Sequence, residues 1–174
     1  MTDLGTLGGP SSAAVAINER GQVVGESDTR SRDGFGVSIR HAFLWEEGRM
    51  RDLGTLGGRA SHVEAINDRG QVVGVAETRE KDEDGDFVEH GVLWEEGRAT
   101  DLGSLYPVAL NDRGQIVGHG VNNFDGRTHA VLLTPTTKRP PECSMNCLRS
   151  KKLSLSGTLA NGTANAAAAC PTPS

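Results

Sequence analysis

The sequence predicts an all-β fold made of three repeated antiparallel units of four strands each. One segment occurs three times, at residues 16–25, 65–74 and 109–118, and it consists of an apolar strand, a polar turn closed by glycine and a second apolar strand. That order is typical of a β-hairpin. Residues 1–135 show no sustained apolar spacing of the kind that a helix needs. Repeats at intervals of about 20–50 residues indicate solenoids, propellers or similar arrays.

Each unit is expected to contain four short strands. The first is the sequence DLGTL at residues 3–7, which recurs at 52–56 and, as DLGSL, at 101–105. The second and third strands flank the polar turn, and the third begins with glutamine in every unit. The fourth strand begins at a recurring histidine, which is His41, His90 or His129. Glycine-containing turns connect the strands.

Four-stranded units at this period are typical of β-propeller blades, and a β-trefoil, which also has three units of four strands, is the alternative. The units are assigned to residues of about 1–49, 50–98 and 99–135. A closed propeller typically needs about four to eight blades. Three units therefore predict an open arc or partial propeller. We favour part of a longer array over a ring closed by the first strand.

Residues 136–174 differ in composition from the repeats. They are rich in Ser, Thr, Ala and Pro and contain all three cysteines of the chain. Such a composition buries too little apolar area to offset the entropy lost on ordering. This tail is therefore predicted to be disordered, and the repeats are expected to need neither disulfides nor thiolate metal sites.

The repeated polar turn invites both a structural and a functional interpretation. Asparagine in such a turn bonds the nearby backbone, and glycine supplies a positive φ. Because fold-forming residues recur in every unit, we interpret the turn residues as structural. These residues are Asn18, Arg20, Gly21, Asn67, Asp68, Arg69, Gly70, Asn111, Asp112, Arg113 and Gly114. The alternative is a ring of acidic and basic side chains at one rim that binds a charged ligand.

Two sets of side chains are candidate metal ligands. The three recurring histidines could bind zinc, but structural zinc typically has about four converging ligands, so each histidine is expected to bond a backbone group or an acidic turn instead. The calcium candidates are Asp82, Asp84 and Asp86, because calcium binds oxygen-rich loops. Gly85 does not stand where an EF-hand loop requires glycine, so a solvated hairpin tip is the favoured interpretation.

Trp45 and Trp94 occupy equivalent positions in the fourth strands of the first two units. They could serve as platforms on which sugars stack. The third unit has Leu133 at the same position, and leucine suits packing between units better than sugar binding. The tryptophans are therefore expected to pack in the core.

The charge of the repeats argues against nucleic acid as a partner. Residues 1–135 hold 13 Lys and Arg against 22 Asp and Glu, a net charge of −9, whereas nucleic-acid binding relies on neutralising phosphates. No apolar run approaches the roughly 18 residues of a membrane span, so no membrane insertion is expected. The first residues show no pattern of a signal peptide. No common catalytic motif occurs, so neither catalytic residues nor a cofactor is expected.

Three motifs in a fixed order, DLGTLGG, AINDRGQVVG and HAFLW, resemble the HAF repeat of bacterial proteins described as probable extracellular repeat proteins. The resemblance covers residues 2 to about 135. It implies a secreted or cell-surface β-repeat protein and carries no known catalytic residues. We expect a non-enzymatic extracellular module that presents variable loops to a protein or glycan, as part of a longer array.

Two other functions fit the sequence. The chain could belong to a propeller-type hydrolase or lyase whose catalytic residues lie in further units, or it could be a structural fragment without independent activity. Terminal units that lack polar caps expose apolar surface. We therefore also expect self-association through exposed blade edges, for example two three-unit arcs that close one ring.

Overall fold

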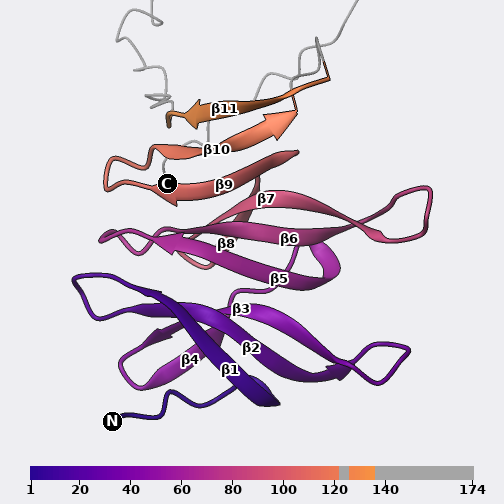
Figure 1. Cartoon of the computed structure of the whole chain (residues 1–174). Helices are drawn as coiled ribbons and strands as arrows, with labels where there is room; N and C mark the ends of the chain where they lie inside the picture. The colour runs from indigo at the N-terminus through magenta and orange to yellow at the C-terminus, as the bar shows by residue number, and fades with distance from the viewer. Residues whose placement is uncertain (122–125, 136–174) are drawn as a thin grey trace, which may run out of the picture. The chain divides into compact units, whose positions relative to one another are not determined.

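The computed structural model describes residues 1–121 and 126–135, and this part of the chain is all-β, with three antiparallel sheets and no helix (Figure 1). Residues 1–136 form one compact unit. The predicted tail at 136–174 lies outside the described residues. Each sheet is a meander in which strands adjacent in sequence are adjacent in space, as the repeated hairpin pattern predicts.

The three sheets take consecutive stretches of the chain. The first sheet contains β1 (Gly8–Ile17), β2 (Val23–Arg32), β3 (Ser38–Glu46) and β4 (Arg49–Asp52). The second contains β5 (Gly57–Ile66), β6 (Val72–Lys81), β7 (Phe87–Glu95) and β8 (Arg98–Asp101). The third contains β9 (Leu105–Leu110), β10 (Ile116–Val121) and β11 (Thr128–Leu133). Within the described ranges no sheet closes on itself.

The first predicted strand of every unit is wrong, because residues 3–6, 53–55 and 102–104 lie outside the strands. The second unit shows the reason. Residues 53–56 form a connection, because the Asp52 carboxylate accepts the N–H of Gly54 at 2.7 Å and Thr55 Oγ1 bonds the backbone of both Gly57 and Gly58. Gly54 and Gly57 also have positive φ angles, which take the backbone out of the extended conformation. The strand next to this connection is β4, which pairs with β3 and completes the first sheet.

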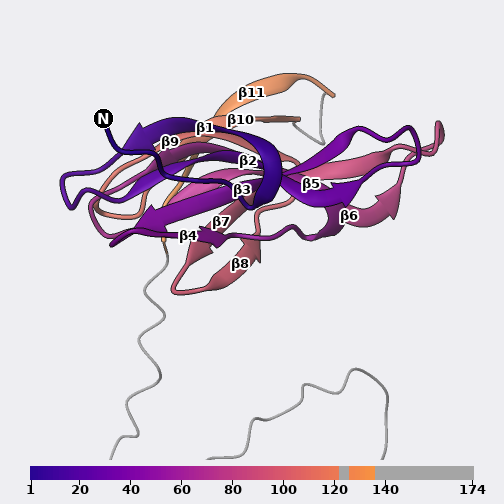
Figure 2. The ribbon, with the colours of Figure 1, turned by 90° about the horizontal axis from the view of Figure 1, so that it is seen from below.

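The core consists of two layers of apolar side chains, one on each side of the second sheet. Val72 and Val73, 1% and 0% exposed, are neighbours in β6 and point to opposite faces. Val72 packs with Val24 and Leu44 of the first sheet, and Val73 packs with Ile116 of the third. The second sheet therefore lies between the other two, as Figure 1 also shows; in the view from below the sheets overlap one another (Figure 2).

A close backbone approach recurs where the first two strands of each sheet pair. The register shifts between Val63 and Ala65 in β5, and there the carbonyl of His62 lies against the Cα of Gly74 in β6. A Cβ at Gly74 would overlap that carbonyl oxygen. Gly25 and Gly118 occupy the equivalent positions and face the carbonyls of Ala13 and Tyr106 in the same way. Glycine is therefore required at this bulge.

We expect Gly74→Ala to lower the free energy of unfolding by about 2–3 kcal/mol, because the added methyl group forces β5 and β6 apart. Urea unfolding followed by circular dichroism measures the change. Gly34→Ala is the matched control, since nothing lies near its Cβ position and its φ is not positive. The control should change stability by no more than about 0.5 kcal/mol; equal effects of the two substitutions would contradict the role given to Gly74.

Candidate functional site

The repeated polar turns are closed by their asparagines. Asn67 Oδ1 accepts the backbone N–H groups of Arg69 and Gln71, at 3.1 and 2.9 Å. Asn18 and Asn111 accept the equivalent pair of N–H groups in their own turns. The glycine of each turn has a positive φ of 75–81°. Within each hairpin these residues form the turn itself.

The same asparagines connect one sheet to the next. Asn18 Nδ2 donates to the backbone oxygen of Asn67 at 2.9 Å, and Asn67 Nδ2 donates to that of Asn111, also at 2.9 Å. Beside them, the N–H of Glu19 donates to the Asp68 carboxylate, and the N–H of Asp68 donates to the Asp112 carboxylate. We call these four hydrogen bonds the asparagine ladder. The ladder engages the carboxylates of Asp68 and Asp112, which a charged ligand at this rim would need.

Each turn is also fastened to its own sheet by a glutamine that the sequence interpretation missed. Gln71 Oε1 accepts from Asn67, and Gln71 Nε2 donates to the Glu95 carboxylate at 2.6 Å. Gln22 makes the same two bonds, with Asn18 and Glu46. The signal in the sequence was the recurrence of glutamine after the turn glycine in all three units. Two arginines of the turns make longer contacts: Arg69 Nη1 donates to the backbone oxygen of Asp112 at 3.4 Å, and Arg20 is 3.9 Å from Glu46 at an exposed position.

His41 bridges the first sheet to the second. Its Nδ1 lies 2.8 Å from the Asp52 carboxylate of β4, and its Nε2 lies 2.8 Å from the backbone oxygen of Arg59 in β5. Both partners are acceptors, so both ring nitrogens must donate, which only the charged imidazolium can do. The predicted bond from a recurring histidine to a backbone group is thus confirmed at His41. His90 bonds Asp101 at the equivalent position.

The ion pair shifts the pKa of both partners. The hydrogen bond to Asp52 raises the pKa of His41 above its ordinary value, and burial opposes this only in part. Burial acts to raise the pKa of Asp52, but the hydrogen bonds from His41 and from the N–H of Gly54 outweigh it, so the pKa is lowered. At Asp101, burial again acts to raise the pKa, but the hydrogen bonds from His90 and from the N–H of Gly103 outweigh it, so the pKa is lowered.

The candidate metal ligands are placed as follows. Asp82, Asp84 and Asp86 lie at the tip of the β6–β7 hairpin, where Asp82 Oδ1 accepts the N–H groups of Asp84 and Asp86 at 3.0 Å each. His41 and His90 are on different sheets and each is paired with its own aspartate. In residues 1–121 and 126–135 no group of three or more His, Cys, Asp or Glu side chains could hold a metal ion. The solvated hairpin tip, with calcium as its alternative, stays a prediction.

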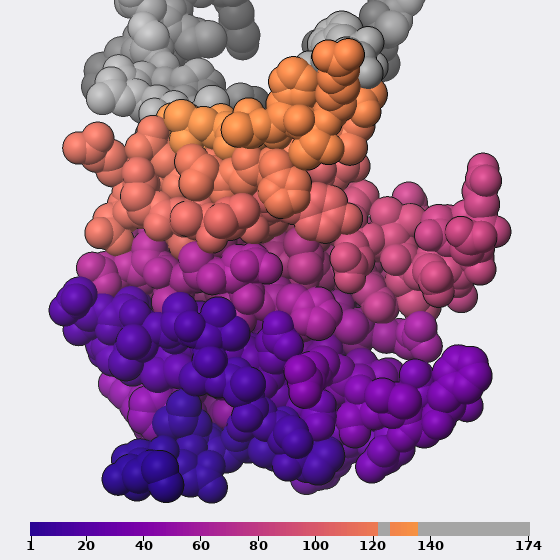
Figure 3. Space-filling view, viewed as in Figure 1, coloured from indigo at the N-terminus to yellow at the C-terminus, as the bar shows by residue number. Residues whose placement is uncertain are grey.

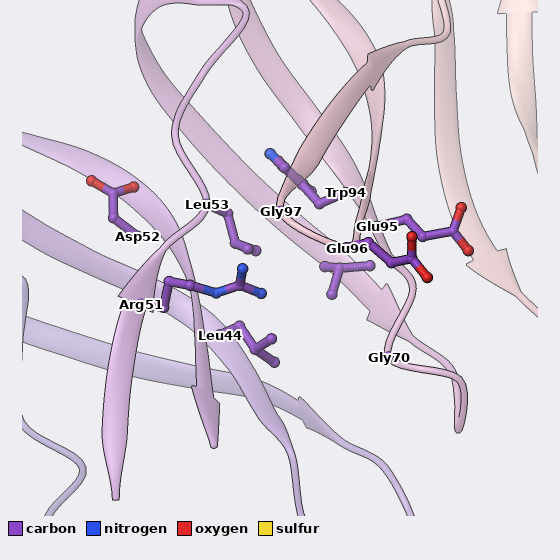
Figure 4. Close-up of a pocket in the computed structure, with 10 residues that line it drawn as sticks. Leu44, Arg51, Asp52, Leu53, Gly70, Trp94, Glu95, Glu96 and Gly97 are labelled. Carbon is purple, nitrogen blue, oxygen red and sulfur yellow. The ribbon is translucent and has the colours of Figure 1, made fainter. Parts of the chain in front are cut away.

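A small pocket lies between the first and second sheets (Figure 4). It has a volume of about 210 Å³, and Arg51 of β4 and Glu96 of the β7–β8 turn lie on opposite sides of it. Trp94 is 3% exposed and packs in the same layer as Val72, which confirms the expected core position of this tryptophan. Ligand pockets typically measure about 300–1,000 Å³. The pocket is therefore smaller than a usual small-molecule site.

The β2–β3 and β6–β7 hairpins extend from the same side of the sheets (Figures 1 and 3). They share a frame: Asp33 and Asp82, at equivalent positions, each accept two backbone N–H groups with one carboxylate oxygen. Their tips differ, because Phe35, which is 95% exposed, stands where the other hairpin has Asp84. Phe87 on the second hairpin is instead covered by the cations of Arg59 and Lys81, each 4.7 Å from the ring centre.

The comparisons with known proteins add no family or function. No protein-family model matches the chain, and no similar curated protein or solved structure was found. Among the described residues, no helix is long and apolar enough to cross a membrane.

We expect the ion pair between His41 and Asp52 to stabilise the fold in a defined pH window. A raised histidine pKa adds stability below the unfolded value of about 6.5, and this is lost as the pH rises through the folded value. A lowered aspartate pKa adds stability above about 3.9, and this is lost as the pH falls through the folded value. The difference in unfolding free energy between wild type and His41→Gln should therefore be largest between about pH 4 and 6.5.

The difference should stay below about 1 kcal/mol, because Asp52 is 43% exposed and water screens the pair. Urea titrations at a series of pH values measure it. His119→Gln is the control, since His119 stacks on Tyr106 and bonds no carboxylate in the described part of the chain. A difference at His41 that does not vary with pH would contradict the assignment.

Proposed function

We propose that residues 1–135 form a non-enzymatic binding module that presents its β2–β3 and β6–β7 hairpins to a protein or glycan outside the cell. The observation that carries the proposal is the contrast between the repeated and the unequal parts of the units. In the repeated turns, the asparagine ladder engages the side chains of Asn18, Asn67, Asp68 and Asp112. The unequal hairpin tips carry exposed side chains on a shared rigid frame.

Phe35 is the residue best suited to bind a partner. Its side chain is 95% exposed, and Val37 beside it is 62% exposed. The Asp33 carboxylate holds the backbone of both residues, at 2.9 and 2.8 Å, so the tip is ordered before it binds. Arg30 and Arg32 are exposed on the strand that leads into this tip. Aromatic and arginine side chains dominate the binding energy of protein interfaces, and aromatic faces also stack on sugars.

The neighbouring hairpin adds charge of the opposite sign. Its tip carries Asp82, Glu83, Asp84 and Asp86, all exposed. A partner that contacts both hairpins would therefore meet an aromatic and basic tip beside an acidic one. Such complementary charges favour specificity and fast association more than affinity.

The architecture supports a propeller-like arrangement over a trefoil. Each of the first two sheets is a four-stranded meander, and consecutive sheets pack face to face through apolar layers, as propeller blades do. From the three sequence motifs that resemble HAF repeats, we assign the units to that repeat type, which implies a bacterial extracellular protein.

The Phe35 tip can be tested by selecting ligands from a glycan array and from a peptide library displayed on phage. We expect selected ligands to lose at least about tenfold in affinity for Phe35→Ala, because an exposed anchor residue contributes more than about 1.4 kcal/mol. Biolayer interferometry measures the affinities. Val15→Ala is the matched control, since Val15 is 50% exposed but lies on β1, away from the hairpins.

Val15→Ala should bind as wild type does. Ligands that bind Phe35→Ala with full affinity would show that this hairpin does not carry the binding function. Circular dichroism of both variants confirms that neither change alters the fold.

A further inference from the structure

The outer face of the third sheet repeats an interface that is buried elsewhere in the molecule. Val24 and Leu44 of the first sheet, 0% and 4% exposed, pack against the second sheet. The equivalent residues of the third sheet are Val117 and Leu132, a cross-strand pair like Val24 and Leu44. They are 45% and 57% exposed. The outer face of the third sheet therefore carries the same apolar pair that the first sheet uses to pack against the second sheet.

The outer face of the first sheet repeats the other half of that interface. In the second sheet, Trp94 is 3% exposed and, with Ile66, packs against the first sheet. The equivalents 49 residues earlier are Trp45, which is half-buried, and Ile17, which is 68% exposed. The two outer faces are thus the complementary halves of an interface that already forms inside the chain.

The asparagine ladder gives the two outer faces different free groups, because all of its bonds run in one direction along the chain. Each sheet donates to the next one along the chain, so the third sheet ends in donors. Asn111 Nδ2 bonds only Gln115 within its own turn, and the N–H of Asp112 has no partner among the described residues. The first sheet ends in acceptors, because neither the backbone oxygen of Asn18 nor the Glu19 carboxylate receives a ladder bond in the part that the structure describes.

The segment that precedes β1 is compatible with this interface. Residues 1–4 lie over Phe43 on the outer face of the first sheet. Leu4 is equivalent to Leu53, which packs in the layer between the first and second sheets and donates its N–H to Ala42 of β3 at 3.0 Å. Since the equivalent segment at Leu53 is part of the packed layer between two sheets, residues 1–4 would be part of the same kind of interface and would not block it.

We propose that a second copy of this chain docks head to tail, with its first sheet on the outer face of the third sheet. The contact would bury Val117 and Leu132 against Ile17 and Trp45 of the other copy and would extend the asparagine ladder by one step. The proposal does not depend on the hairpins binding a partner. A contact between two unlike faces is heterologous, so it produces a closed ring where the geometry closes and a chain of copies where it does not.

Sedimentation velocity of the full chain and of two face variants tests the proposal. Leu132→Glu places a charge on the third-sheet face, and Ile17→Glu places one on the first-sheet face. Each variant alone should be a monomer, with self-association weakened at least about a hundredfold, because an unpaired charge would be buried. An equimolar mixture of the two should form a dimer and nothing larger, since each variant keeps one intact face.

Val108→Glu is the matched control. Val108 is 55% exposed, and its equivalent in the second sheet is Glu64, which is exposed although both faces of that sheet are covered. This variant should associate as the wild type does. The proposal is overturned if the wild-type chain is a monomer at all concentrations, if the mixture of face variants stays monomeric, or if Val108→Glu is as disruptive as Leu132→Glu.

Discussion

The fold depends on an asparagine that performs two tasks at each of the first two repeated turns. The asparagine side chain closes its own hairpin with Oδ1 and reaches the backbone of the next turn with Nδ2. Asn67 is 5% exposed, so all of its polar atoms must be satisfied inside the protein. The ladder holds the turns at a fixed distance and in register, and the apolar faces of adjacent sheets then meet, with Val72 on one side of the second sheet and Val73 on the other.

The same constraint separates the structural residues from those that can vary. Side chains in the ladder or in the bridge from His41 to Arg59 must recur, because each is paired with an atom of the following unit. Among the described residues, the tips of the β2–β3 and β6–β7 hairpins make no such bond to another unit, and there Phe35 in one unit replaces Asp84 in the other. The ladder also has a direction, so a chain with a limited number of sheets presents unlike ends.

The sequence predicted the local structure well and the contacts between units poorly. The turn with asparagine and glycine identified the hairpins because its chemistry is local. Residues 53–56 were predicted to be part of a strand, but the Asp52 and Thr55 side chains bond the local backbone and hold it out of the extended conformation. The bond from Asn67 to Asn111 could not be predicted, since the spacing of repeats does not specify which atoms of two turns approach each other. The sequence also could not identify the outer face at Leu132 as an interface, because that conclusion requires knowing that the equivalent residue, Leu44, is buried.

The ladder is tested most directly by comparing Asn67→Ala with Asn111→Ala in urea unfolding. Both substitutions remove the same bonds within the turn, but only the first removes a side-chain donor to the next sheet, and only at that site is the asparagine buried. We expect Asn67→Ala to cost about 1–3 kcal/mol more than Asn111→Ala, because it removes the bond to the next sheet and leaves the N–H and Oε1 of Gln71, which is 6% exposed, without their partners. Equal losses of stability would contradict the account, since they would mean that the turns are held by local bonds alone.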